Sequence, residues 1–239
     1  MWRWDKMNLT ILYEDNHLIV CVKPPGVLSQ PGSKNLPDML TLLKAYLKEK
    51  YVKPGNVFLG LVHRLDLNVG GVMVFARTSK AASRLSDSIR EHAFQKTYIA
   101  IVEGGGFANN EQGTYLDQLE KEPNDRIAEI DSSGKQAELH YRALASGSWK
   151  KIPVTFMEIQ LVTGRFHQIR VQFASRGHPL LNDRKYGAKS LSKSNEIGLW
   201  AYRLSFPHPV TQETLVFFAP PEGELFGPFQ SHFSALLPL

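Results

Sequence analysis

The chain has 239 residues, of which 43% are hydrophobic and 21% are charged, a composition typical of a soluble globular protein. It holds one cysteine, which excludes internal disulfides. It has no apolar run of about 18 residues and no continuous apolar stretch near its start, so we expect neither a membrane-spanning helix nor a secretory signal. Its net charge of +5 favours polyanionic partners only mildly, and we expect a cytoplasmic protein.

The first 50 residues predict two strands, a loop and a helix. Residues 9–23 are two apolar segments around a polar Asp15-Asn16 turn, which is typical of two short strands. Residues 24–32 contain prolines, which lack N–H donors, so we expect a surface loop there. Residues 36–50 fit an amphipathic helix. Its apolar side comprises Leu36, Met39, Leu40, Leu43 and Leu47.

The next segment predicts a strand, a helix and a second strand. Residues 71–77 are apolar throughout and indicate a buried strand. Ser79 is a candidate N-cap for a helix over residues 80–92. Residues 96–104 form the next predicted strand. The inward side of the helix comprises Ala82, Leu85 and Ile89.

The middle of the chain predicts loops followed by a hairpin. Residues 105–135 are polar and rich in Gly, Asn, Asp and Glu, which favours loops and short exposed strands. Residues 136–146 and 152–162 indicate an antiparallel pair of strands that is joined near Gly147-Ser148.

The last third predicts one helix and two strands. A helix is expected over residues 166–176, because Gly177 ends it and Pro179 follows. Two strands are expected at residues 199–206 and 213–219. Strands and helices are mixed without regular alternation, which favours an α+β fold in one compact domain.

A charged cluster interrupts apolar sequence in LVHRLDLNVGG, residues 61–71. Asp66 is either a loop aspartate that pairs with Arg64, or a carboxylate that its apolar neighbours keep partly dry. In the second case a nearby cation would keep it ionised, so that it could act as a nucleophile or a base. Gly70 and Gly71 would let a ligand or another segment approach closely.

Cations gather at the start of the helix predicted after residue 165, within TGRFHQIRVQFASRGHPLLNDRKYG, residues 163–187. Arg165, His167, Gln168 and Arg170 crowd its first turn, where the helix dipole disfavours positive charge. A phosphate-bearing partner would explain them, since anions bind at helix N-termini. A solvated basic surface explains them equally well.

Two other kinds of site are disfavoured. His63, His167 and His178 form no HExxH or other recognised metal-ligand spacing, so we expect no catalytic metal. No G-x-S-x-G segment is present, so a serine hydrolase is not indicated. A hydrolase that uses Asp66 with His63 is the weakest alternative. Cys21 lies in an apolar segment and is expected to be a buried strand residue.

Five stretches occur in an order that resembles the RluA-type pseudouridine synthases, from about residue 9 to residue 220. The HRLD stretch together with the TGR-HQIR stretch is the most specific part of this resemblance. The five are ILYEDNHLIVCVKPPGVLSQPG (11–32), LVHRLDLNVGGVMVFARTSKAASRLSDSI (61–89), QKTYIAIVEG (95–104), TGRFHQIRVQFASRGHPLLNDRKYG (163–187) and RLSFPHPVTQE (203–213).

The resemblance implies a fold, a reaction and an RNA partner. The fold is a central, mostly antiparallel sheet with flanking helices and a basic cleft. The reaction is the isomerisation of selected RNA uridines to pseudouridine, without cofactor or metal. The target base must leave its stack before the chemistry, which suits a short stem-loop of ribosomal or transfer RNA.

The resemblance also implies roles for individual residues. Asp66 matches the catalytic aspartate, which either attacks the ribose carbon or removes a sugar proton. Tyr98 matches the tyrosine that stacks on the target base, and Arg170 the arginine that pairs with the aspartate. Arg64 matches an arginine that enters the RNA stack where the base has left. The predicted substrate contacts are His63, Arg64, Arg165, His167 and Gln168.

The sequence departs from the family pattern in three places. After HRLD the family has Arg or Lys, Asp, Thr, Ser or Thr, and Gly, so two hydroxyl side chains are missing here, at positions 69 and 70. Asn182 replaces the glycine of GHPLLGD, and asparagine is the next-best residue where φ is positive. Trp200 stands within the segment that is often LHA. The departures after HRLD motivate an alternative, an RNA-binding or RNA-folding protein with weak or absent catalysis.

The expected organisation is a tail at residues 1–8, the catalytic domain at residues 9–220 and a C-terminal extension at residues 221–239. No small RNA-binding domain is expected before residue 9, so the catalytic domain would select its RNA largely by itself. We expect a monomer.

Overall fold

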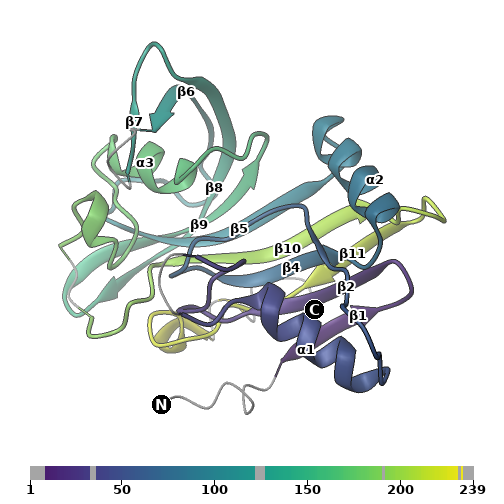
Figure 1. Ribbon diagram of the computed structural model, residues 1–239. Helices are drawn as coiled ribbons and strands as arrows, with labels where there is room; N and C mark the ends of the chain where they lie inside the picture. Colours follow the sequence, from purple (N-terminus) through teal and green to yellow (C-terminus); the bar gives the residue numbers. More distant parts are fainter. Residues whose placement is uncertain (1–8, 33–35, 122–126, 190–191, 231–232, 234–239) are drawn as a thin grey trace. The chain divides into compact units, whose positions relative to one another are not determined.

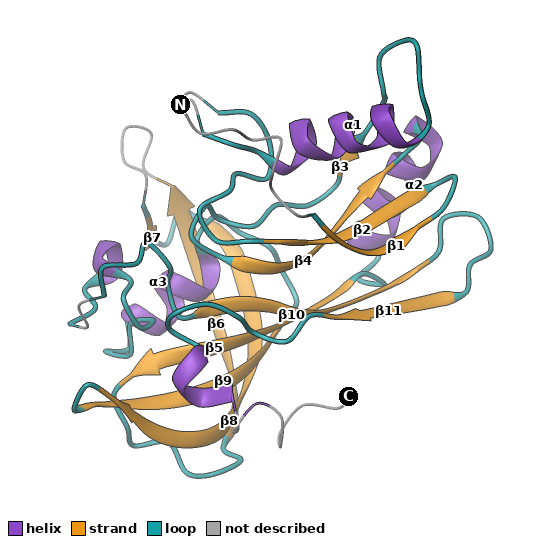
Figure 2. Ribbon diagram, turned by 90° about the horizontal axis from the view of Figure 1, so that it is seen from below, coloured by secondary structure: helices purple, strands orange, loops and turns teal. Residues whose placement is uncertain are grey.

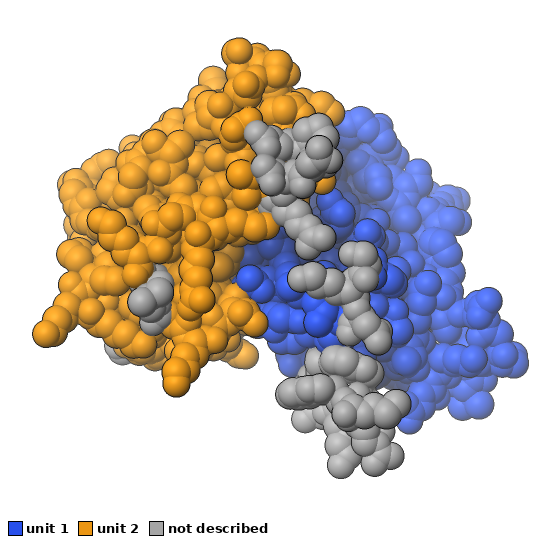
Figure 3. All heavy atoms as spheres, turned by 60° about the vertical axis from the view of Figure 1, so that its left-hand side comes forward, with its two compact units in different colours: residues 1–94, 203–219 blue, residues 95–202, 220–239 orange. Residues whose placement is uncertain are grey.

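A computed structural model describes residues 9–32, 36–121, 127–189, 192–230 and 233, and the chain divides into two compact units (Figure 3). Unit 1 comprises residues 1–94 and 203–219, and unit 2 comprises residues 95–202 and 220–239. The tail predicted at residues 1–8 lies outside the described residues. The limits of the catalytic domain at residues 9 and 220 stay a prediction.

Unit 1 is built from antiparallel strands and two helices (Figures 1 and 2). Strand β2 pairs with β1 on one side and with β4 on the other, β3 also pairs with β4, and β10 pairs with β11. The predicted strands at 9–23, 71–77, 199–206 and 213–219 are confirmed. The elements are β1 (Thr10–Glu14), β2 (Leu18–Lys23), α1 (Met39–Lys50), β3 (Gly60–Leu61), β4 (Gly70–Ala76), α2 (Ser79–Arg90), β10 (Leu199–Pro207), which continues from unit 2, and β11 (Thr214–Phe218).

The core of unit 1 covers both faces of β2 and β4. Successive strand residues point to opposite faces, and every side chain from Leu18 to Cys21 is fully buried. On one face Leu18 and Val20 pack with Val72, Val74 and residues of α2 and β10. Cys21 is buried in this strand, as predicted, and burial raises the pKa of its thiol to about 12, so it is not a reactive thiolate.

Local capping sets where the two helices of unit 1 begin. The Asp38 carboxylate accepts a hydrogen bond from the Thr41 amide at 2.8 Å, so α1 begins at Met39 and the predicted Leu36 lies outside it, 37% exposed. Helix α2 is capped by Thr78 rather than by the predicted Ser79, since the Thr78 hydroxyl accepts from the Ala81 amide at 3.1 Å. Both predicted helices are confirmed with shifted starts.

Unit 2 contains five antiparallel strands in the order β5-β9-β8-β6-β7 and a short helix (Figures 1 and 2). Helix α3 is shorter than predicted and ends before Gly177, whose φ is +81°. The α+β fold with a mostly antiparallel arrangement of strands is therefore confirmed. The elements are β5 (Gln95–Glu103), β6 (Gln112–Lys121), β7 (Ala128–Ile130), β8 (Lys135–Trp149), β9 (Ile152–Leu161), α3 (Gln168–Ala174), and the 3-10 turns η2 (Arg184–Tyr186) and η3 (Gly227–Phe229).

The predictions about the middle of the chain were partly wrong. The exposed strands expected within residues 105–135 are present as β6 and β7, but β6 is not short, since it has ten residues and pairs with β8 over its first eight. The β8–β9 hairpin turns at Lys150 and Lys151, both with positive φ, and not at Gly147-Ser148. A two-residue loop with two positive φ angles matches the twist of the flanking strands.

The described residues after 220 pack within unit 2. Leu225, Phe226, Phe229 and Phe233 are buried, and the Phe229 ring centroid lies 4.8 Å from that of Phe156 on β9. The predicted C-terminal extension thus contributes to the core of this unit where it is described. No helix in the described ranges combines the length and the apolarity that crossing a membrane requires.

Candidate active site

The segment between β3 and β4 in unit 1 carries Asp66. Ser29 fixes it: the Ser29 hydroxyl accepts from the Leu65 amide at 3.0 Å and donates to the Leu65 carbonyl at 2.8 Å. The Val69 amide donates to the Asp66 carbonyl at 3.1 Å and closes a turn. Leu65 and Val69 are buried, whereas Asp66 is half-buried and Arg64 is exposed. The loop therefore presents a partly desolvated carboxylate on a fixed backbone.

Lys23, at the end of β2, is fully buried and binds this loop through the Leu67 carbonyl. Its ammonium donates to three carbonyl oxygens, those of Val27 at 2.7 Å, Pro24 at 3.1 Å and Leu67 at 3.2 Å. Burial lowers the pKa of Lys23 to about 7, and the negative charge of Asp66 opposes this shift. Lys23 was missed by the sequence reasoning. The signal was a lysine at the end of a strand that is otherwise wholly apolar.

The loop at 24–32 is less exposed than predicted, because it holds the Asp66 segment. The Gly26 amide donates to the Leu67 carbonyl at 2.8 Å, and Val27 and Ser29 are buried. Val69 stands where the family has a hydroxyl side chain. It is 2% exposed, so the loop is held here by a buried apolar side chain. The departure from the family pattern thus leaves the loop well fixed.

His63 belongs to the interior of unit 1. Its Nε2 accepts a hydrogen bond from the Val74 amide at 3.1 Å, and its ring centroid lies 5.4 Å from that of Phe94. These contacts explain His63 by the fold of unit 1, and its predicted contact with RNA stays a prediction. They also weaken a hydrolase in which His63 is the base, since Nε2 already has a backbone donor.

Unit 2 carries the two other predicted catalytic residues. Tyr98 lies on β5 and is 7% exposed. Arg170 lies on α3, and its Nε and Nη2 donate to the two carboxylate oxygens of Asp183 at 2.7 and 2.9 Å. Both partners are buried, and the guanidinium also lies over the Tyr186 ring, 5.0 Å from its centroid. Asp183 was missed by the sequence reasoning, although it ends the apolar part of GHPLLND.

Gln168 holds the TGR turn together. Its Oε1 accepts from the Thr163 hydroxyl at 2.8 Å and from the Arg165 amide at 3.0 Å, and its Nε2 donates to the Glu138 carbonyl at 3.0 Å. The side chain is 3% exposed. These bonds account for Gln168 by the fold alone, so its predicted contact with RNA stays a prediction without structural support.

His167 and Arg165 are oriented differently from each other. His167 has a left-handed backbone, φ +53°, its Nδ1 is hydrogen-bonded to the Tyr186 hydroxyl at 2.8 Å, and its ring stacks on Phe166. Arg165 is exposed, and its Nε donates to the Gln136 carbonyl at 2.8 Å. With only seven residues, α3 is too short for the helix-dipole argument made from the sequence. Asn182 has φ +62°, as expected for the residue that replaces glycine.

The predicted site residues thus fall into two groups, one in each unit. Unit 1 holds His63, Arg64 and Asp66 on one segment, and unit 2 holds Tyr98 on β5 and the other four between residues 165 and 170. The pairing of Asp66 with Arg170 and the basic cleft stay predictions. In the described part of the chain no cluster of three His, Cys, Asp or Glu side chains could hold a metal.

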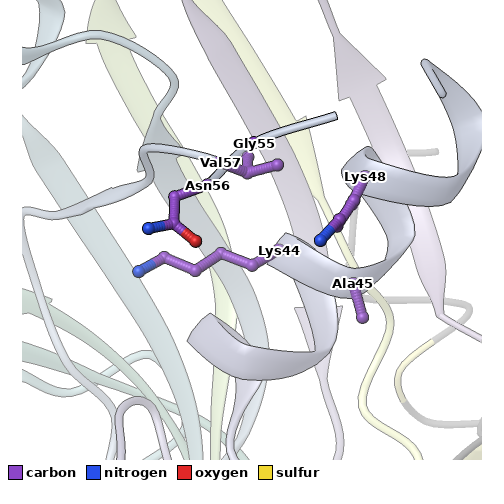
Figure 4. A pocket seen from close by; sticks show the side chains of 6 residues that line it. All are labelled: Lys44, Ala45, Lys48, Gly55, Asn56 and Val57. Atoms are coloured by element: carbon purple, nitrogen blue, oxygen red, sulfur yellow. The ribbon is translucent and has the colours of Figure 1, made fainter. Parts of the chain in front are cut away.

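An open hollow of about 420 Å³ in unit 1 contains none of the predicted site residues. It lies between α1 and the segment at 55–57, and Lys44, Lys48 and Asn56 line it (Figure 4).

Comparisons with known proteins identify the family. Residues 17–175 match the family model of the RNA pseudouridylate synthases. The RNA pseudouridine synthase YhcT of Bacillus subtilis is 32% identical over 228 residues, which cover 95% of this chain and 73% of the relative. The ribosomal large subunit pseudouridine synthase C of Haemophilus influenzae is 35% identical over 87% of this chain and 64% of the relative.

A solved structure shows the same fold. The human RNA pseudouridylate synthase domain containing 1 aligns with a TM-score of 0.71 at 23% identity, over 90% of this chain and 84% of the human one. The match with the family model, the relatives and the shared fold agree with the motifs at 61–89 and 163–187. The chain belongs to the RNA pseudouridylate synthase family, whose members are isomerases that convert uridine in RNA to pseudouridine.

Proposed function

We propose that this protein isomerises uridine in ribosomal RNA, with Asp66 as the catalytic group and without a cofactor. The single observation that carries the role of Asp66 is its setting: a half-buried carboxylate on a loop that Ser29 and the fully buried Lys23 hold in place. The choice of ribosomal RNA rests on relatives that are named ribosomal large subunit pseudouridine synthases C and D.

The reaction needs few groups. The bond between uracil N1 and ribose C1′ breaks, the uracil rotates, and a bond forms between C5 and C1′. The proton on C5 then leaves, and N1 ends protonated, so that product and substrate are isomers. Asp66 either attacks C1′ and forms an ester that the returning base displaces, or removes a proton from the sugar. A carboxylate can take both roles if it is ionised and partly dry.

The other residues bind and orient the nucleotide. We assign Tyr98 to stacking on the uracil, Arg170 to pairing with Asp66, and Arg64 to filling the stack that the base leaves. Arg170 is well fixed for such a role, because its bidentate bond to Asp183 leaves the guanidinium one orientation. Arg64 is exposed, as a group that enters an RNA stack must be. Arg165 and His167 would contact the RNA backbone.

We make three further assignments. We place the protein in the cytoplasm, we assign it as a monomer, and we expect it to select a uridine-containing stem-loop. Light scattering of the purified protein should give a mass near 27.0 kDa, and the complex with RNA should give the same protein mass once the mass of the RNA is subtracted. A protein mass near twice that value would contradict the monomer.

The test compares pseudouridine in ribosomal and transfer RNA from cells with and without the gene. At least one pseudouridine of ribosomal RNA should be lost in the deletion strain and restored by the wild-type gene. Asp66→Asn should fail to restore it. Asp87→Asn is the matched control, because it makes the same chemical change at an exposed position of α2.

Each other outcome has a defined meaning. Restoration by Asp66→Asn would contradict the role of Asp66. A pseudouridine lost only from transfer RNA would contradict the ribosomal substrate and leave the isomerase intact. If the deletion strain loses no pseudouridine but has an RNA-folding defect, and the Asp66→Asn gene corrects that defect, the RNA-binding alternative would be supported.

A further inference from the structure

Lys96 lies at the start of β5, two residues before Tyr98. Successive strand residues point to opposite faces, so the side chains of Lys96 and Tyr98 share one face of β5, about 7 Å apart along the strand. Both residues belong to unit 2. A base that stacks on Tyr98 would therefore bring its ribose and phosphate into the neighbourhood of the Lys96 ammonium.

The Lys96 ammonium is desolvated without a protein acceptor. Lys96 is half-buried, burial lowers its pKa, and no residue in the described ranges gives it a hydrogen bond or an ion pair. Lys23 shows the contrast, since three carbonyl oxygens surround its buried ammonium. An ammonium carries three donors, and removing it from water without acceptors is unfavourable. An arriving anion would correct this deficit.

Gly164 makes room for this ammonium. A Cβ at Gly164 would lie 3.2 Å from Lys96 Nζ, and no other heavy atom lies within 4 Å of it. The backbone of Gly164 is not in the left-handed region, so conformational freedom does not explain the glycine. The TGR turn is thus shaped to let the Lys96 side chain reach this place.

Other cations lie at the same turn. Arg165 follows Gly164 directly and is exposed, and the Lys121 ammonium lies over the Phe166 ring, 5.0 Å from its centroid. The nearby Glu138 carboxylate is directed at His140, 3.9 Å away. This end of β5 therefore combines a recessed cation with exposed ones, an arrangement suited to a chain of phosphates.

We propose that Lys96 binds a backbone phosphate of the RNA, next to the target uridine that stacks on Tyr98. The proposal rests on the proposed function and adds to it a specific anchor. Lys96 is a binding residue in this account and takes no part in the chemistry. Its ammonium fixes the position of the RNA backbone along β5, so that the target uridine lies opposite Tyr98.

The test measures binding and turnover separately. Binding of a synthetic RNA stem-loop with a loop uridine is followed over a range of salt concentrations. Turnover is followed by tritium release from ribosomal RNA of cells that lack the protein. The variants are Lys96→Met, Lys96→Arg and Gly164→Ala, with Lys48→Met as a control that removes the same charge from the hollow beside α1.

Lys96→Met should weaken stem-loop binding by about tenfold and reduce the slope of log K against log salt by about 0.7–0.9, the loss of one phosphate contact. The KM of the Lys96→Met variant should rise, whereas its kcat should stay within about threefold of the wild-type value. Gly164→Ala should have a smaller effect in the same direction, since its Cβ, 3.2 Å from Nζ, would shift the ammonium slightly. Lys96→Arg should keep most of the slope, and Lys48→Met should leave it unchanged.

Three results would overturn the proposal. One is an unchanged slope in Lys96→Met; another is an equal effect of Lys48→Met, which would indicate general electrostatic attraction. The third is a loss of kcat with unchanged binding, which would place Lys96 in the chemistry. Failure of the proposed function is distinguishable: wild-type protein would then release no tritium, while the salt slope would still respond to Lys96→Met.

Discussion

Removing the charge of Asp183 should destabilise the protein strongly. The Asp183 carboxylate is 1% exposed and accepts two charge-assisted hydrogen bonds from Arg170, at 2.7 and 2.9 Å. Asp183→Asn keeps the size and one acceptor oxygen, but it removes the negative charge that lies against the buried guanidinium on this side. Losing one partner of a buried pair raises the free energy of the folded state by about 3–5 kcal/mol. Two charge-assisted bonds worth about 1.5–3 kcal/mol each would give a loss of about 3–6 kcal/mol, which is an upper limit because asparagine keeps one acceptor.

Urea unfolding of four proteins measures this effect. Asp183→Asn, Arg170→Met and the double variant complete a cycle with the wild type, and the double variant should be more stable than the sum of the single losses predicts, by about 2 kcal/mol.

The control is Asp87→Asn, because Asp87 pairs with Arg90 at the same 2.7 Å but with side chains 44% and 73% exposed. It should lose less than about 1 kcal/mol. Equal losses at Asp183 and Asp87 would refute the reasoning from burial.

Three further changes test local features. Gly134→Ala places a Cβ 2.4 Å from the backbone of β6 and should lower the unfolding free energy by about 1–3 kcal/mol, while Gly105→Ala, with open space around it, should stay within about 0.5 kcal/mol. Equal effects would contradict this. Replacing Lys150 and Lys151 by Asn and Gly relieves φ angles of 45° and 72°, and urea unfolding should show a gain of about 1–2 kcal/mol rather than a loss. The third concerns pH: burial lowers the pKa of Lys23 from 10.5 to about 7, so the unfolded state holds more protons between these values. The unfolding free energy of the wild type relative to Lys23→Met should therefore rise between pH 7 and 10, by at most about 1.4 kcal/mol per unit, and a constant difference would contradict the shift.

Burial on both faces made much of the fold predictable. Strands β2 and β4 are apolar at every position except Lys23. Capping was predicted less well, because Asp38 was not named as an N-cap and Thr78 takes the place of the predicted Ser79. The length and bounds of strand β6 were not predicted, because only Tyr115 and Leu119 are buried along its ten residues and its sequence is as polar as a loop. A strand of this kind is held by its neighbours, which local sequence does not reveal.

The hairpin turn was misplaced for a tertiary reason. A glycine at position 147 favours a turn in the local sequence. However, Trp149 is 6% exposed, and its ring centroid lies 6.1 Å from that of Phe229. This contact with a segment 80 residues further along keeps β8 extended through Gly147 and moves the turn to Lys150 and Lys151.

The site residues that lie in recognisable motifs were predictable from the sequence. The charged residues that matter because they are buried were not. Asp66 and Arg170 stood out as charged residues beside apolar sequence, but their roles, and Tyr98 altogether, came from the motif resemblance. Lys23, Asp183 and Lys96 were overlooked, because a charged residue at the end of an apolar run is ordinarily solvated. Their burial results from carbonyls, a guanidinium and a glycine that lie elsewhere in the sequence.

The most direct test of the account uses purified protein and RNA labelled with tritium on uracil carbon 5, taken from cells that lack this protein. Tritium passes to water only if C5 becomes bonded to C1′ and loses its hydrogen. Wild-type protein and Asp87→Asn should release tritium at equal rates, and Asp66→Asn should release none while it keeps its urea midpoint and its affinity for RNA. Release by Asp66→Asn at the wild-type rate would contradict the account of the site.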